Sequence, residues 1–217
     1  MNLVIEDILR LSTLLPILLF LFFKQKEKVK WVFFYFCGFI FIHAVISALL
    51  AIYYGKNIVF YFNIIFIPVE FLIISYFFSN VIEYEFHKKI LLISSSIFIL
   101  LYIIITVISP LVRFNSLING LESILIISYS LFFFYEKLRY PKNLFIYSQP
   151  YFWGVSAFFL FFTTSFFVFL FRQMAWSQSI FIYQYVYIHA FAGIIRNILL
   201  GVGMIAKPEK AGMAELT

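Results

Sequence analysis

Seven apolar stretches of about 20 residues divide the chain, and short polar or charged segments separate them. A helix of this length crosses the hydrocarbon core of a bilayer. The stretches fall at about 3–23, 31–54, 58–79, 90–108, 115–135, 150–171 and 180–206. Because the separators are short, consecutive helices must be neighbours in space. The pattern therefore predicts an all-α fold: a polytopic integral membrane bundle of seven transmembrane helices, forming a single membrane domain over residues 1–217.

The basic residues predict how this bundle is oriented. Eleven Lys and Arg residues flank the helix ends on one side, and four flank the ends on the other. Cytoplasmic loops carry the excess of basic residues, so we expect the amino terminus outside and the carboxyl terminus inside, ending in a short cytoplasmic tail at 207–217. The eleven are Lys24, Lys26, Lys28, Lys30, Lys88, Lys89, Lys137, Arg139, Lys142, Lys207 and Lys210, and the four are Arg10, Lys56, Arg113 and Arg172.

Composition supports a membrane protein and limits its partners. Hydrophobic residues make up 64% of the chain and charged residues only 12%, which is too little charge to cover a soluble domain. The net charge of +6 is explained by lysines that face anionic lipid headgroups. We therefore expect the lipid bilayer as a partner and no nucleic acid. Glu6 and Asp7 stand where a signal peptide would carry basic residues, which predicts a retained first helix.

Ionisable side chains inside the predicted spans are costly, so they face the bundle interior and pair. At about 1.5 Å per residue, Glu70 and Arg196 both fall in the inner half of the membrane, which predicts an ion pair between them. Asn63 and Asn197 belong to the same group, and Pro68 would free a carbonyl and bend its helix. The pair could be a staple that fixes helix register, or a switch used in signalling or transport.

A second polar group is predicted in the outer half by the same arithmetic. It contains His43, Asn119, Glu122 and His189, which would line a pocket open to the outside. His43, Glu122 and His189 could hold a metal as two histidines and a carboxylate. Alternatively, these residues satisfy one another by hydrogen bonds, and we predict no metal and no cofactor.

The sequence lacks the retinal-binding lysine and the common catalytic and nucleotide-binding motifs. Retinal is disfavoured, because its Schiff base needs a lysine midway along the seventh helix and the nearest lysines are Lys207 and Lys210, beyond the inner end. No Walker loop, dinucleotide fingerprint, GxSxG elbow or HExxH sequence occurs. These observations favour a protein that is not an enzyme.

Four segments resemble a family of small, uncharacterised seven-helix membrane proteins of Gram-negative bacteria, often encoded beside sensor histidine kinases. They are NIIFIPVEFLIISYFF at 63–78, NGLESILIISYSLFF at 119–133, PYFWGVSAFFLFFTTSFF at 150–167 and HAFAGIIRNILLG at 189–201. The resemblance implies a location in the bacterial inner membrane, and a sensory or accessory role with a membrane histidine kinase or another membrane protein as partner.

We therefore expect a sensory or accessory protein that binds a small or lipidic ligand in the outer-half pocket and signals through a membrane partner. A small secondary transporter or channel would use the same buried charges as coupling groups. A metal-dependent intramembrane enzyme and a purely structural assembly subunit are further alternatives.

Overall fold

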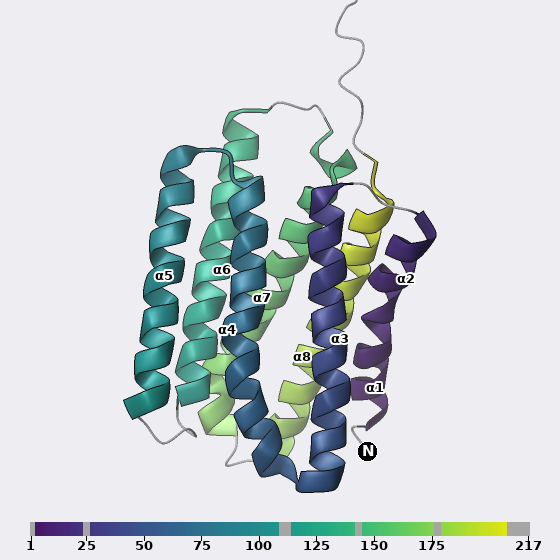
Figure 1. Cartoon of the computed structure of the whole chain (residues 1–217), viewed down its shortest axis with the longest axis vertical. Coiled ribbons are helices and arrows are strands. Elements are labelled where there is room, and N and C mark those ends of the chain that lie inside the picture. Colours follow the sequence, from purple (N-terminus) through teal and green to yellow (C-terminus); the bar gives the residue numbers. More distant parts are fainter. Residues whose placement is uncertain (1–2, 24–26, 109–113, 142–144, 176–178, 208–217) are drawn as a thin grey trace, which may run out of the picture.

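The computed structural model describes residues 3–23, 27–108, 114–141, 145–175 and 179–207. This part of the chain contains only helices and short connections, arranged as a bundle (Figure 1). The helices are α1 (Leu3–Ser12), α2 (Leu14–Phe23), α3 (Lys28–Tyr54), α4 (Lys56–Val81), α5 (Glu85–Ile108), α6 (Phe114–Arg139), the 3₁₀ turn η1 (Ile146–Ser148), α7 (Pro150–Ala175) and α8 (Ser179–Ile205). Residues 208–217 of the predicted tail lie outside the described residues.

Six helices in the described ranges are long and apolar enough to cross a membrane. They correspond to the second to seventh predicted stretches, and the candidate spans within them are Lys28–Tyr54, Tyr61–Val81, Glu85–Ile108, Leu117–Arg139, Pro150–Phe169 and Val186–Ile205. The all-helical membrane architecture predicted from the sequence is confirmed to this extent. The fold is that of a helical membrane bundle.

The first predicted stretch, 3–23, is not one continuous helix, and this corrects the prediction. It is divided into α1 and α2, of 10 residues each. Pro16 has no N–H to donate to the Ser12 carbonyl, which removes one bond of the helical ladder and weakens the helix at this point. The hydroxyls of Ser12 and Thr13 also donate to the carbonyls of Leu9 and Arg10, at 2.7 and 2.6 Å, and such local bonds compete with the helical ladder.

Pro68 lies inside α4, as the sequence indicated, and its effect on the backbone is compensated. Proline cannot supply the bond that the Ile64 carbonyl would receive in a regular helix. The Tyr102 hydroxyl, which comes from α5, donates a hydrogen bond to that carbonyl. The carbonyl that Pro68 leaves without a helical partner is therefore satisfied by a neighbouring helix, as the backbone of a membrane helix requires.

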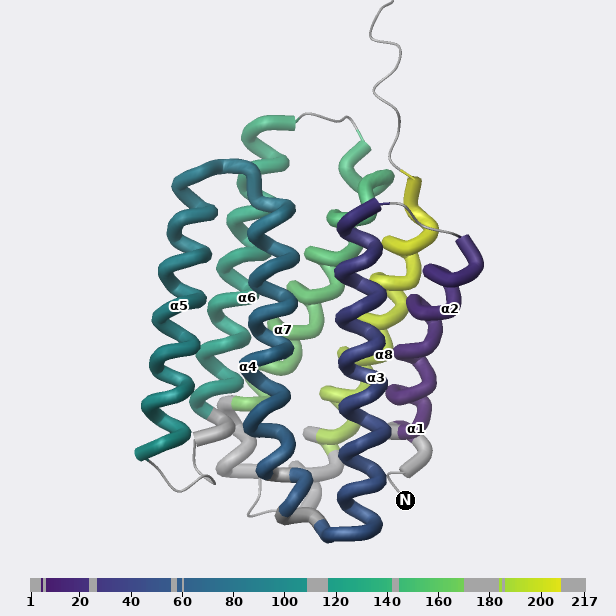
Figure 2. Tube along the Cα trace, in the orientation of Figure 1, coloured from purple at the N-terminus to yellow at the C-terminus, as the bar shows by residue number. Residues whose placement is uncertain are grey.

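The arrangement brings α8 into contact with helices from both halves of the chain. It packs against α7 along much of its length and also against α1, α2 and α3. Figure 2 shows α1 and α2 following one another along α8, beside α3. The core between the helices is rich in phenylalanine, and Phe158 of α7 contacts the rings of Phe36 and Phe77 at centroid distances of 5.1 and 5.4 Å.

One end of the bundle collects most of the described basic residues, and we call it the basic end. The first residues of α3 and α5 and the last residues of α6 and α8 meet there (Figure 1). It carries Lys28, Lys30, Lys88, Lys89, Lys137, Arg139 and Lys207. The helix connection at Gly55 lies at the opposite end.

Candidate functional site

Arg196 lies in the interior of the bundle, on α8, with only 4% of its surface exposed. Its Nη1 atom is 3.8 Å from Oε1 of Glu70 on α4, so the predicted contact between these residues is present. The guanidinium also faces the rings of Phe161 and Phe36, at 4.3 and 5.2 Å from their centroids. Aromatic faces stabilise a cation in a site from which water is excluded. Arg196 is thus held by one carboxylate and two rings.

Asn197 extends this site to the amino-terminal helices. Its Nδ2 donates a 2.7 Å hydrogen bond to Oγ of Ser12, at the end of α1, and its Oδ1 accepts one of 3.4 Å from Nε of Arg196. We call Ser12, Glu70, Arg196 and Asn197 the interior polar cluster. It joins the break between α1 and α2 to helices α4 and α8.

Sequence reasoning missed Ser12, although a signal for its position existed. Asn197 is flanked at four residues on either side by Gly193 and Gly201, and small residues at this spacing let helices approach closely. A Cβ on Gly193 would lie 2.6 Å from Leu9 of α1, and one on Gly201 would lie 3.3 Å from Leu15 of α2. The glycines thus form the surface against which the broken helix packs.

Glu122 on α6 contributes a second buried carboxyl, with 4% of its surface exposed. Among the described residues its Oε1 has no hydrogen-bond partner, and the same holds for Oδ1 of Asn119 and Oγ1 of Thr163. Glu122 interacts electrostatically with Glu70 and with Tyr102. It is therefore a second interior carboxyl, with one oxygen atom that lacks a hydrogen-bond partner among the described residues.

The charges inside the described bundle do not balance. Between its two ends, the buried acidic and basic side chains are the carboxyls of Glu70 and Glu122 and the guanidinium of Arg196. If all three are charged, the interior carries one excess negative charge. An uncompensated carboxylate in a low-dielectric interior is costly, so a proton or a cation must neutralise it. This excess is the main chemical property of the site.

His43 and His189 each have local partners, and His189 shares the ring of Phe161 with Arg196. Nε2 of His43 lies 3.0 Å from Oδ1 of Asn63 and 3.3 Å from Oγ of Ser47, and its ring stacks on Phe66. Nδ1 of His189 lies 3.4 Å from Oγ of Ser165 on α7. Asn63, which the sequence grouped with Glu70 and Arg196, thus contacts His43 instead.

The metal alternative is not supported by this arrangement. No three His, Cys, Asp or Glu side chains gather at metal-binding distances in the described part of the chain. His43, Glu122 and His189 therefore do not form the two-histidine, one-carboxylate set considered from the sequence. The reason is geometric: the depth of a residue in the membrane does not say which way its side chain faces around the helix axis.

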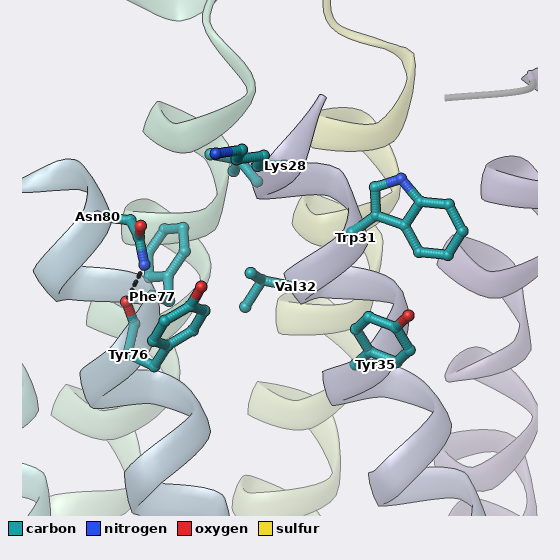
Figure 3. A pocket seen from close by; sticks show the side chains of 8 residues that line it. Lys28, Trp31, Val32, Tyr35, Tyr76, Phe77 and Asn80 are labelled. Atoms are coloured by element: carbon teal, nitrogen blue, oxygen red, sulfur yellow. Dashed lines mark hydrogen bonds between the residues drawn. The ribbon is translucent and has the colours of Figure 1, made fainter. Parts of the chain in front are cut away.

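Two of the cavities lined by described residues lie between neighbouring helices. One, of about 240 Å³, lies between α3 and α4 and is shown in Figure 3. The other, of about 570 Å³, lies between α4 and α5 and includes Ser75, Ser79, Ser95 and Ser96 in its lining. None of His43, Asn119, Glu122 and His189 lines either cavity, so neither corresponds to the predicted outer-half pocket.

Glu136 and Lys30 are buried charges at the basic end. The sequence pattern did not single out Glu136, and it used Lys30 only as a basic residue that predicts orientation. Glu136, near the end of α6, accepts hydrogen bonds from the amides of Glu83 and Tyr84, at 2.8 and 3.2 Å, and contacts Nδ1 of His87 at 2.7 Å. Nζ of Lys30 donates to the Ala206 carbonyl at 2.7 Å. Both residues tie together backbone ends from different helices, which is a structural role.

Comparison of the chain with known protein families, with curated proteins and with solved structures finds no match. The functional interpretation therefore rests on the geometry described above.

Proposed function

We propose that the chain crosses a bacterial cytoplasmic membrane seven times, with its amino terminus outside. In this arrangement α1 and α2 together form a discontinuous first crossing. The proposal is supported by the way these two short helices pack in succession along α8, against Gly193 and Gly201. The orientation is supported by the collection of lysines at the basic end, which would face the cytoplasm.

We propose further that the protein is a small secondary transporter that exchanges protons for a monovalent cation. The observation that carries this proposal is the excess buried carboxyl, with Oε1 of Glu122 lacking a hydrogen-bond partner among the described residues. Because the interior cannot hold the uncompensated charge, a proton or a cation must always be bound. The same carboxyl oxygens accept either ion, so binding one requires release of the other.

Exchange also needs access from each side of the membrane in turn, and three features of the interior suit such a change. The first predicted crossing is broken at Thr13, and α4, although continuous, contains Pro68 and so lacks one bond of its helical ladder. Helices that are broken as the first crossing is line ion sites in transporters. Nη1 of Arg196 and Oε1 of Glu70 are 3.8 Å apart, which is longer than a hydrogen bond. The Glu70 carboxyl can therefore exchange partners without first losing a tight bond.

The test is an ion-flux measurement with purified protein in liposomes that enclose a pH-sensitive dye. A sodium or potassium gradient is imposed, and the internal pH is followed. We expect a protein-dependent pH change with at least one of the two cations. Glu122→Gln keeps the shape of the side chain and removes its charge, so it should reduce the flux to that of protein-free liposomes.

Glu85→Gln provides the matched control, because Glu85 is an exposed glutamate in the first turn of α5. It should transport as well as the unmodified protein. Wild-type protein that folds and inserts but gives no flux with either cation would overturn the proposal. Equal flux in the Glu122→Gln variant and the wild type would reject Glu122 as the ion site.

A sensory or accessory role with a membrane partner is the second candidate. The observation that favours it is the cavity between α4 and α5, where Ser75 and Ser79 stand four residues apart. Small residues at this spacing accommodate a neighbouring transmembrane helix. A stoichiometric membrane partner that is lost on Ser79→Leu, together with no ion flux, would support this role over transport.

A further inference from the structure

The cavity between α3 and α4 has a polar part and an apolar part (Figure 3). At the basic end, Lys28 lies on the α3 side of the cavity and Asn80 on the α4 side. Farther from that end come Tyr76, Val32 and Tyr35. The complete lining is Lys28, Val29, Trp31, Val32, Tyr35, Tyr76, Phe77 and Asn80.

Lys28 is available to an outside ligand, in contrast to its near neighbour Lys30. Nζ of Lys30 is held by the Ala206 carbonyl and by Glu27, at 2.7 and 3.2 Å. Lys28, by comparison, forms no ion pair with any residue that the structure describes, and its side chain lines the cavity. The cavity thus contains a positive charge without a counterion from the described chain.

Two tyrosines accompany this lysine on the outer surface of the bundle. Tyr35 is 60% exposed and Tyr76 is 61% exposed, so both phenol groups face the surroundings rather than the core. Lys28 is the first residue of α3, and Tyr35 is about 10 Å farther along the helix at 1.5 Å per residue. Tyrosine and tryptophan prefer this interfacial depth, where one side of the ring is apolar and the other meets polar groups.

We propose that this cavity binds the headgroup and upper acyl chain of an anionic phospholipid from the adjoining membrane leaflet. The Lys28 ammonium would bind the phosphate, and the hydroxyls of Tyr35 and Tyr76 would donate to the phosphate or glycerol oxygens. Val32 and the apolar faces of the two tyrosine rings would contact the first part of an acyl chain. The polar residues Lys28 and Asn80 lie at the basic end of the cavity and the apolar Val32 lies farther along it, as the charged and apolar parts of a phospholipid require. The unpaired cation selects an anionic lipid.

The proposal is tested by titrating delipidated, detergent-solubilised protein with phosphatidylglycerol and with phosphatidylcholine of the same acyl chains. Native mass spectrometry counts the bound lipids. The part of the tryptophan quenching by brominated chains that is lost in Trp31→Phe reports binding beside Trp31, since the chain has three tryptophans. We expect phosphatidylglycerol to bind more tightly than phosphatidylcholine. Lys28→Gln should weaken phosphatidylglycerol binding about fivefold, equivalent to ~1 kcal/mol, and Lys28→Arg should preserve it.

Lys89→Gln is the matched control, since Lys89 is an exposed lysine at the same end of the bundle but on α5. It should leave phosphatidylglycerol binding unchanged. Equal binding of the two lipids, or equal losses in Lys28→Gln and Lys89→Gln, would overturn the proposal. A protein dimer that Lys28→Gln dissociates would also overturn it, by assigning the cavity to a second copy of the chain.

Discussion

Asn197 of α8 and Ser12 of α1 are 185 positions apart in the chain and are joined by a hydrogen bond of 2.7 Å. The bond ends at the point where the first apolar stretch is broken. Ser12 also donates to the Leu9 carbonyl, so its hydroxyl is used both as donor and as acceptor. The break is therefore hydrogen-bonded to the residue beside Arg196. A movement of α1 against α2 would displace Ser12 and so shift Asn197 within the interior polar cluster.

Removal of this bond should measurably destabilise the protein. Ser12→Ala leaves Nδ2 of Asn197 without its acceptor, and side-chain hydrogen bonds between membrane helices contribute about 0.6 kcal/mol on average and up to about 1.7 kcal/mol. We expect a lower midpoint of thermal unfolding in detergent. Ser128→Ala is the control, because among the described residues the Ser128 hydroxyl bonds only to the Ile124 carbonyl of its own helix. Equal shifts in the two variants would argue against a role for the Ser12 to Asn197 bond.

The bond from Tyr102 to the carbonyl freed by Pro68 predicts a specific rescue. Tyr102→Phe removes the only described donor to the Ile64 carbonyl, and a buried unsatisfied group of this kind costs ~1–2 kcal/mol. In a Pro68→Ala background, the substituted alanine supplies the missing N–H, so Tyr102→Phe should cost much less. The measurement is thermal unfolding of both single variants and of the double variant. Tyr53→Phe, on an exposed ring of α3, is the control and should have no effect in either background.

Some of these features could be predicted from the sequence, and others could not. The six long spans follow from the length of their apolar runs, and the Glu70 to Arg196 contact follows from depth arithmetic and the need to pair buried charge. The break at Thr13 did not follow, because the residues around it continue the apolar pattern. The decisive features are the missing N–H of Pro16 and the hydroxyls of Ser12 and Thr13, which hydropathy does not register.

The predicted outer-half pocket shows a different limit. Residue depth groups His43 with His189, but the rotation of each helix about its axis decides which side chains meet. In the structure His43 contacts Asn63 of the following helix, and His189 contacts Ser165 of the preceding one. In both cases the partner lies on the helix that comes directly before or after in the sequence. Short connections bring such helices together first, so polar residues on consecutive spans were the better candidates for pairing.

Close packing of α7 predicts that glycine is required at one position and not at another. A Cβ on Gly154 would lie 2.3 Å from Phe33 and 2.9 Å from Phe77, and both rings are fully buried. Gly154→Ala should therefore destabilise the protein by ~2 kcal/mol through overpacking. Gly38 has no atom within 4 Å of its Cβ position, so Gly38→Ala should be neutral or slightly stabilising. Unfolding midpoints that fall equally for both would contradict the packing described for Gly154.

The Glu136 carboxylate should be essential for the start of α5, because it accepts from two backbone amides in the preceding connection. Glu136→Ala leaves both amides and His87 without their acceptor, and bonds to a charged group contribute ~1.5–3 kcal/mol each. We expect a loss of stability and faster amide hydrogen exchange at 83 and 84. Glu83→Gln tests the neighbouring ion pair with Lys137, in which the Glu83 side chain is 47% exposed. It should have a smaller effect than Glu136→Ala, because water solvates the exposed carboxylate and weakens the pair.

The pairing of Arg196 with Glu70 predicts strong non-additivity between substitutions at the two sites. Arg196→Leu leaves two buried carboxyls with no described cation between them, and breaking a buried pair costs about 3 kcal/mol or more. Glu70→Gln with Arg196→Leu removes both charges, so the double variant should recover a large part of that loss in folded protein after detergent extraction. Glu122→Gln with Arg196→Leu is the matched comparison, because Glu122 forms no ion pair with Arg196 in the structure; it should recover less.

Equal losses in Arg196→Leu and in the double variant with Glu70→Gln would show that the two residues act independently. Equal recovery with Gln at position 70 or 122 would instead mean that the net charge of the interior, rather than the 3.8 Å contact, determines stability.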